Sequence, residues 1–315
     1  MKNKKTIIFS IIFTAILLFI LIINIELQDI YNNIKKVKLI YILPAFLFHI
    51  GAYFFRSLSF YLVTEKGKIS FWQLLFAHFV HNFYLHMIPA NLGELSFPIL
   101  LKGKLKTEES LSMLFISRFI SMIVTILLFL LSLFFVFQWK NNFVFNIQMY
   151  SVIIALLLLI GFLMFLFRAK IIAFLSKNSF IKKIITKFLS LLNSVRNDIL
   201  KFKSLSFFLF YMFSIVVSIL SVSYFYLFIL QGMEIDVTIF QVIFVSSIGV
   251  AFVLLPIKSI GGFGTTEGAW TVGLMLLGFT KELSITAGFV VHLYALINVV
   301  IFFFIGLIFR YLLKK

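Results

Sequence analysis

The sequence contains no cysteine, only four prolines and only eleven acidic residues among 315. Without cysteine there are no disulfides, thiolate metal sites or thiol nucleophiles, and the redox compartment cannot be read. Charged residues make up 12% of the chain, against about 25% in a soluble domain. Residues of the AVILMFWYC set make up 62%, and the mean hydropathy is +1.13. A soluble fold of this size cannot bury that much apolar surface, so most side chains must contact lipid.

The formal net charge is +17, which in a soluble protein would indicate nucleic-acid binding. Here the lysines and arginines stand beside apolar runs, so anionic lipid headgroups are the expected partners and nucleic acid is not.

Six apolar stretches have the length of a membrane-spanning helix, for which about 20 residues suffice. They cover residues 6–25, 39–63, 110–137, 150–167, 205–230 and 284–309. Two further apolar regions, 71–101 and 238–278, are interrupted near their middle by proline, glycine and glutamate. We interpret these two as re-entrant hairpins that enter and leave the membrane on one side.

The distribution of lysine and arginine predicts the orientation. If both hairpins are re-entrant, twenty of the 28 basic residues lie in segments on one side and five lie on the other. The richer side is cytoplasmic by the positive-inside rule, which predicts a multi-pass protein of the cell membrane with both termini inside.

The chain divides into two similar halves, 39–137 and 205–309, each with a span, a broken region and a span. Their predicted orientations are opposite, so the fold class is an all-α membrane protein built as an inverted repeat in one domain, 1–315. Between the halves, residues 168–204 form a basic amphipathic pattern, which predicts a cytoplasmic linker helix lying on anionic inner-leaflet lipid.

Glu94 and Glu267 are the only acidic residues within the broken regions, at equivalent positions of the two halves. A carboxylate at membrane depth is costly and is a functional candidate by default. We expect both to face a shared polar cavity near the midplane. The alternative is that each only caps the half-helix that follows it.

The run from Gly261 to Gly264 allows positive φ angles and close approach of backbone N–H groups to an anion. A tight turn would need the same residues. Candidate anion contacts are Lys258, Gly261, Gly262, Gly264 and Thr265.

Arg56 and Arg118 lie within the spans that flank the first broken region. Each could extend to the interface, but together they favour pairing with a glutamate or a phosphate. The five histidines form no defensible metal site, and no cofactor is expected.

These motifs resemble the membrane domain of lysylphosphatidylglycerol synthases, the multiple peptide resistance factor family, and related stand-alone flippase-like proteins. The matching segments are Arg56, 89–95, Arg118 within 116–119, and 256–269, and the resemblance extends over essentially the whole chain. The chain departs from the family pattern at Ser117 and at Phe97-Pro98. The resemblance implies lipid translocation without the soluble aminoacyltransferase domain of two-domain relatives.

The leading hypothesis is a transporter, not an enzyme, for an amphiphile with an anionic phosphate: a phospholipid, an aminoacylated lipid or a polyprenyl-phosphate-linked sugar. A separate lipid-modifying enzyme or glycosyltransferase is a possible partner. The alternatives are a membrane transferase acting on lipid-linked substrates, for which the outer loops offer little room, and a small-ion exchanger.

Overall fold

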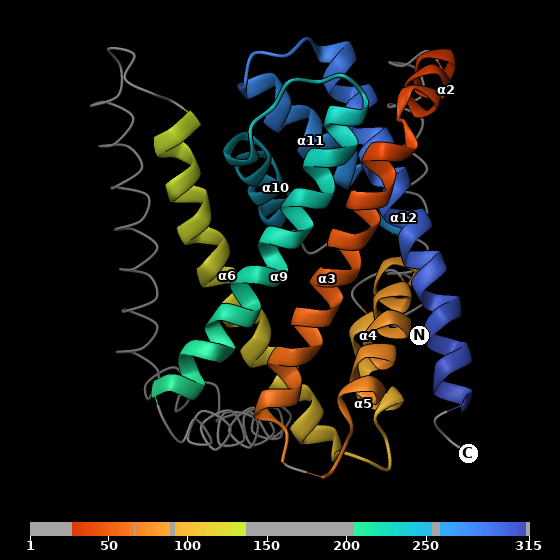
Figure 1. The fold of residues 1–315 in the computed structure, drawn as a ribbon, viewed down its shortest axis with the longest axis vertical. Helices are drawn as coiled ribbons and strands as arrows, with labels where there is room; N and C mark the ends of the chain where they lie inside the picture. The colour runs from red at the N-terminus through yellow and green to blue at the C-terminus, as the bar shows by residue number, and fades with distance from the viewer. Residues whose placement is uncertain (1–26, 66, 89–91, 137–204, 254–258, 313–315) are drawn as a thin grey trace, which may run out of the picture.

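The computed structural model describes residues 27–65, 67–88, 92–136, 205–253 and 259–312 (Figure 1). Within these ranges the chain is helical, with one isolated β-bridge between Lys102 and Leu105 and no β-strand. The expected spans 6–25 and 150–167, and the linker 168–204, lie outside the described residues. Helices predominate because lipid cannot satisfy backbone polar groups, so each segment must bond to itself.

Four described helices are long and apolar enough to cross a membrane. They are α3 (Leu39–Val63), α6 (Thr107–Val136), α9 (Leu205–Gly232) and α12 (Lys281–Leu312). Each coincides, within three residues at either end, with a span predicted from the sequence. The all-α membrane fold is thereby confirmed, while the total of six spans stays a prediction.

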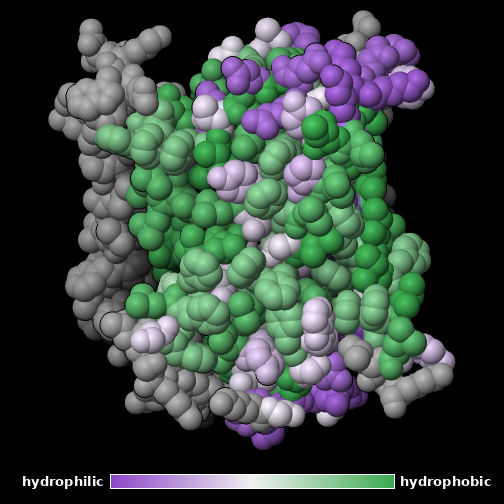
Figure 2. Space-filling view, in the orientation of Figure 1, coloured by the Kyte–Doolittle hydropathy of each residue, from purple (hydrophilic) through white to green (hydrophobic). Residues whose placement is uncertain are grey.

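The four long helices run in two directions along the vertical axis of Figure 1. α3 and α12 descend and α6 and α9 ascend, so the outer helices of one half run opposite to those of the other. Figure 2 shows hydrophilic residues gathered at the top and bottom of this face, with a broad hydrophobic belt between them. This distribution is typical of a protein that spans a bilayer.

The two broken regions form shorter elements at opposite ends of the molecule. α4 (Phe71–Met87), η1 (Leu92–Leu95) and α5 (Ser96–Leu100) lie in the lower half of Figure 1, and α10 (Ile239–Val253) and α11 (Thr265–Leu276) lie in the upper half. η2 (Ile260–Gly262) joins α10 to α11 and packs against α4. α4 has 17 residues and α10 has 15, so each is about 22–25 Å long and shorter than the roughly 30 Å hydrocarbon core. That the hairpins are re-entrant, and that the halves form an inverted repeat, stay predictions.

The same capping pattern begins both hairpins. Ser70 and Gln73 exchange backbone and side-chain hydrogen bonds of 3.2 and 3.3 Å at the start of α4. Thr238 and Gln241 do the same at the start of α10, with distances of 3.3 and 2.8 Å. This Ser/Thr-x-x-Gln capping box satisfies two free backbone N–H groups. It is readable in the sequence and occurs at the first helix of each broken region.

The predicted outer loop 26–38 contains a further helix, α2 (Leu27–Lys36). Lys35 lies over the ring of Tyr31, with the ammonium nitrogen 4.3 Å from the ring centroid. Tyr294 of α12 donates a hydrogen bond of 3.4 Å to the carbonyl of Ile34. This helix was not predicted from the sequence, because it is too short and too polar to form an apolar run.

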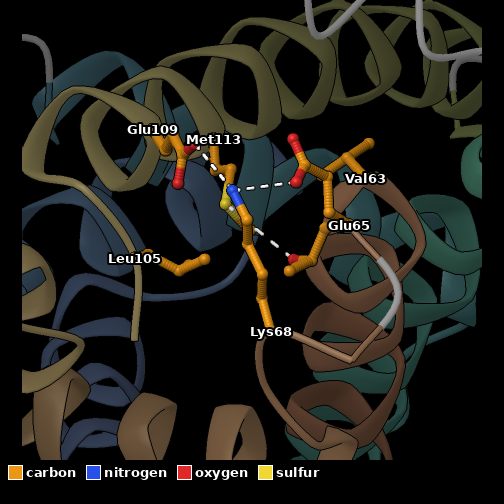
Figure 3. A pocket seen from close by; sticks show the side chains of 7 residues that line it. Val63, Glu65, Lys68, Leu105, Glu109 and Met113 are labelled. Atoms are coloured by element: carbon orange, nitrogen blue, oxygen red, sulfur yellow. Dashed lines mark hydrogen bonds and ion pairs between the residues drawn. The ribbon is translucent and has the colours of Figure 1, made fainter. Parts of the chain in front are cut away.

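A polar clasp closes the lower end of the first half, beside a small pocket (Figure 3). The ammonium group of Lys68, in the α3–α4 connection, lies 2.9 Å from a carboxylate oxygen of Glu65 and 3.0 Å from one of Glu109 on α6. Hydrogen bonds to Glu65 and then to Glu109 raise the pKa of Lys68. The clasp joins the beginning of α4 to that of α6 across the pocket.

Candidate functional site

Arg118 and Glu94 form an ion pair between a long helix and the first hairpin. Glu94 lies in η1, and the Nη2 atom of Arg118, on α6, contacts its Oε1 atom. Arg118 is eleven residues into α6, about 16 Å along the helix axis and thus well within an apolar span. Its side chain is 42% exposed and that of Glu94 is 28% exposed. The ion pair is therefore partly exposed.

Arg56 approaches the same pair from α3. Its Nη1 atom donates a hydrogen bond of 3.2 Å to the hydroxyl of Ser121 on α6. Arg118 and Glu94 are both close enough to act electrostatically on its guanidinium. These three residues carry two guanidinium groups and one carboxylate, and Arg118 is the arginine that forms an ion pair with Glu94.

His81 of α4 completes this group, which we call the Glu94 cluster (Arg56, His81, Glu94 and Arg118). Its Nδ1 atom lies 2.7 Å from the hydroxyl of Ser96, and its Nε2 atom lies 3.8 Å from Glu94 Oε2. The sequence argument considered this histidine only as a metal ligand. Its position shortly before Glu94 in the same broken region was the signal in the sequence that could have identified it as a partner of this glutamate.

The glycine run in the second hairpin forms a tight turn. The φ angles are +68° at Gly261, +80° at Gly262 and +83° at Gly264, a region that favours glycine. A Cβ atom on Gly262 would lie 2.9 Å from the hydroxyl oxygen of Thr266 and 3.4 Å from Nε2 of His292. The turn therefore depends on both the freedom and the small size of glycine.

Glu267 caps the helix that follows this turn. Its Oε2 atom accepts a hydrogen bond of 2.7 Å from the backbone N–H of Gly264, and its side chain is fully buried. Thr265 donates a hydrogen bond of 2.9 Å to the carbonyl of Gly262, and its hydroxyl lies 3.1 Å from that of Ser259. The cap that the sequence offered as an alternative is thus present. Glu267 itself therefore occupies the N–H of Gly264 that was a candidate anion contact.

His292 of α12 holds the other side of Glu267. Its Nδ1 atom lies 2.7 Å from Glu267 Oε1, and its Nε2 atom lies 2.9 Å from the carbonyl oxygen of Gly261. A glycine one turn earlier on α12, Gly288, permits this contact, because a Cβ there would lie 3.1 Å from the carbonyl oxygen of Glu267. We call Gly261, Gly262, Gly264, Thr265, Glu267 and His292 the turn cluster.

The sequence argument did not assign a role to His292. A buried carboxylate needs a partner, and His292 is the histidine of the span that directly follows Glu267. That requirement was the signal that could have found it.

The two glutamates have different partners, Arg118 for Glu94 and His292 for Glu267. η1, which carries Glu94, contacts the preceding helix α4, and η2, which lies just before Glu267, also packs against α4. A single cavity shared by both glutamates stays a prediction. Lys258 lies outside the described residues, so its predicted contact with the turn is not placed.

Within the described part of the chain, no three histidine, aspartate or glutamate side chains gather as they would around a metal ion. The Glu94 cluster combines a carboxylate, two guanidinium groups and an imidazole, and the turn cluster combines a carboxyl group with an imidazole. Such groups bind anions and carry protons without a cofactor.

Long apolar helices with polar ends define this chain as a multi-pass α-helical membrane protein. The family described as "Lysylphosphatidylglycerol synthase TM region" matches residues 7–302, and the chain belongs to this family. The match confirms the resemblance seen in the intramembrane motifs. Comparisons with curated proteins and with solved structures find no match.

Proposed function

We propose that this protein transports an amphiphile with an anionic phosphate headgroup across the cell membrane, as a flippase. The observation that supports this function best is the Glu94 cluster, which holds two arginines, Arg56 and Arg118, and one carboxylate at the depth of an apolar span. A guanidinium in lipid requires a carboxylate or phosphate partner, so the surplus cation favours an anionic ligand.

The accessibility of Arg118 supports a binding role over a purely structural one. Its guanidinium is 42% exposed while it contacts Glu94, so a phosphate can approach it without opening a packed core. In the empty site Glu94 neutralises the guanidinium, and in the occupied site the phosphate takes its place. Arginine offers a planar fork that matches two phosphate oxygens, which a lysine ammonium does not.

The substrate class includes phospholipids, aminoacylated lipids and polyprenyl-phosphate-linked sugars, which share the phosphate that the cluster would recognise. A separate lipid-modifying enzyme or glycosyltransferase would supply the modified lipid, and this chain would move it without chemical change. Anionic inner-leaflet lipid at residues 168–204 is a further proposed contact.

The test measures translocation of a fluorescent anionic phospholipid in reconstituted vesicles for two variants of Arg118. Arg118→Gln removes the charge, and loss of a charge-assisted hydrogen bond of about 1.5–3 kcal/mol weakens headgroup binding roughly ten- to hundredfold. Arg118→Lys keeps the charge but loses the fork, so transport should also fall, by less. Lys104→Gln, at an exposed position of the lower connection, is the matched control.

Near-normal transport by Arg118→Lys would count against phosphate recognition by the guanidinium fork. Mass spectrometry of the vesicle lipids after the assay addresses the alternative function, because a transferase would change the mass of the lipid. A modified lipid would overturn the assignment of transport alone.

A further inference from the structure

The two contacts of His292 need two hydrogens, one more than a neutral imidazole and an ionised carboxylate carry together. A carbonyl oxygen can only accept, so the 2.9 Å contact with Gly261 places a hydrogen on Nε2. The 2.7 Å contact between Nδ1 and Glu267 Oε1 then needs a second hydrogen. Without this hydrogen, a lone pair of Nδ1 would face a lone pair of Oε1 in the protein interior. The side chain of Glu267 is 0% exposed there, and that of His292 is 4% exposed.

The second hydrogen can reside on either atom. On Nδ1 it makes an imidazolium beside a carboxylate, and on Oε1 it makes a neutral imidazole beside a carboxylic acid. In both cases the pair carries one proton and no net charge, which is the form that burial favours. The other oxygen of Glu267 accepts from Gly264 in either case.

Loss of this proton breaks one specific contact. The remaining imidazole N–H can serve Glu267 or Gly261, but not both. A charge-assisted bond to a carboxylate is stronger than one to a carbonyl, so the hydrogen bond to Gly261 is lost. The lone pair of Nε2 then faces the carbonyl oxygen of Gly261, and the repulsion separates the turn from α12.

We propose that Glu267 and His292 form a binding site for a single proton, and that the bound proton fastens the Gly261–Gly264 turn to α12. The turn is then held at low pH and released as the pH rises through the titration of the pair. This part stands on the geometry of the turn cluster alone. The further role of the proton as the coupling ion of transport rests on the proposed function.

Other titratable groups on the packed elements do not replace this pair. The elements that contact α11, η2 and α12 carry other titratable or charged residues in the described chain. These are Tyr41, His49, Tyr53, Arg56 and Tyr61 on α3, His78, His81, Tyr84 and His86 on α4, Asp29, Tyr31, Lys35 and Lys36 on α2, Tyr211, Tyr224 and Tyr226 on α9, and Lys281, Glu282, Tyr294, Arg310 and Tyr311 on α12 itself. Within the described ranges, Glu267 and His292 form their side-chain ion pair with each other and with none of these.

Glu267→Gln is the decisive variant, because it reproduces the contacts of the pair without the added proton. The glutamine oxygen accepts from Gly264, and its amide donates to Nδ1 of a neutral His292, whose Nε2–H still reaches Gly261. The turn in this variant should therefore remain fastened at every pH. His292→Gln removes the two ring nitrogens that contact Glu267 and Gly261 and assigns the His292 signals, and His86→Gln is a histidine control on α4.

The experiment uses the full chain in lipid nanodiscs between about pH 5 and pH 10, a range that brackets histidine titration. Nitrogen-15 NMR of labelled histidine and infrared spectroscopy of the carboxyl group together count the protons on the pair. The rate of backbone amide hydrogen exchange in residues 259–268 reports release of the turn. At each pH the rate in wild type is divided by the rate in Glu267→Gln. This ratio removes the intrinsic pH dependence of exchange.

One proton should be present at low pH and lost as the pH rises. Above that pH the exchange ratio should increase up to tenfold per pH unit, as expected for linkage to one proton. A neutral His292 beside an ionised Glu267 throughout, or an exchange ratio that is flat over the range, would overturn the proposal.

Transport measured in the reconstituted vesicles of the translocation assay, with and without a pH gradient, separates the two proposals. Titration of the pair without lipid translocation would leave the proton site intact and reject the transporter. Translocation with no titration of the pair, or with no response to the gradient, would reject proton coupling and leave the transporter.

Discussion

The hydroxyl of Ser218 on α9 donates a hydrogen bond of 2.8 Å to the carbonyl of Ala52 on α3, across 166 residues of sequence. Nearby, a Cβ on Gly51 would lie 3.7 Å from the hydroxyl oxygen of Ser221, so small residues face each other where the helices cross. Small side chains allow helix backbones to approach closely in a membrane, where no hydrophobic force brings helices together. This contact joins the two predicted halves of the protein.

Enlarging Ser218 should destabilise this crossing much more than removing its hydroxyl. Ser218→Ala should cost about 0.6 kcal/mol, the typical value for a hydrogen bond between membrane helices. Ser218→Leu overfills the contact and should cost about 1–3 kcal/mol. Thermal unfolding in detergent measures both, with Leu209→Ala on the exposed side of α9 as control. Equal midpoints for Ser218→Leu and the control would contradict the close packing.

The predicted orientation can be tested directly because the chain has no native cysteine. Single cysteines at Lys36, at the upper end, and Lys104, at the lower end, occupy exposed positions. A membrane-impermeant thiol reagent should label position 36 in intact cells and position 104 only after permeabilisation, because the basic residues favour the lower side as cytoplasmic. Labelling in the reverse order would invert the topology.

The Lys68 clasp should lose its contribution only at strongly alkaline pH. Contacts with Glu65 and then Glu109 raise the pKa of Lys68, so the protonated amine is favoured in the folded protein. The stabilisation is therefore complete below the ordinary lysine pKa of about 10.4 and disappears as the pH rises through the raised value. Lys68→Met should lower the thermal midpoint at about pH 7, and the difference from wild type should vanish above the raised pKa.

Lys104→Met is the matched control for this clasp, since it removes an exposed lysine from the same end of the molecule. Its midpoint should follow that of wild type at both pH values. A constant difference between wild type and Lys68→Met across the pH range would show that packing of the lysine stem, and not its charge, holds the connection.

The positions of α3, α6, α9 and α12 could be predicted because an uninterrupted apolar run of about 20 residues is a local property of the sequence. The breaks in the two hairpins were predictable from the sequence as well, because each combines proline with glycine and a glutamate within an apolar run. Glu94 and Glu267 stood out because a charge in an apolar segment is costly in any fold. The family motifs in these segments led to the same membrane class that the family match shows.

The partners of the two glutamates were decided only by the packing of distant segments. Arg118 meets Glu94 because α6 returns beside the first hairpin, where the guanidinium stays partly exposed. His292 reaches both Glu267 and Gly261 because α12 packs closely against α11 at Gly288. Apolar length determines which segments enter the membrane, but side-chain pairing depends on which helix faces meet. Those faces are set by close contacts between residues far apart in sequence.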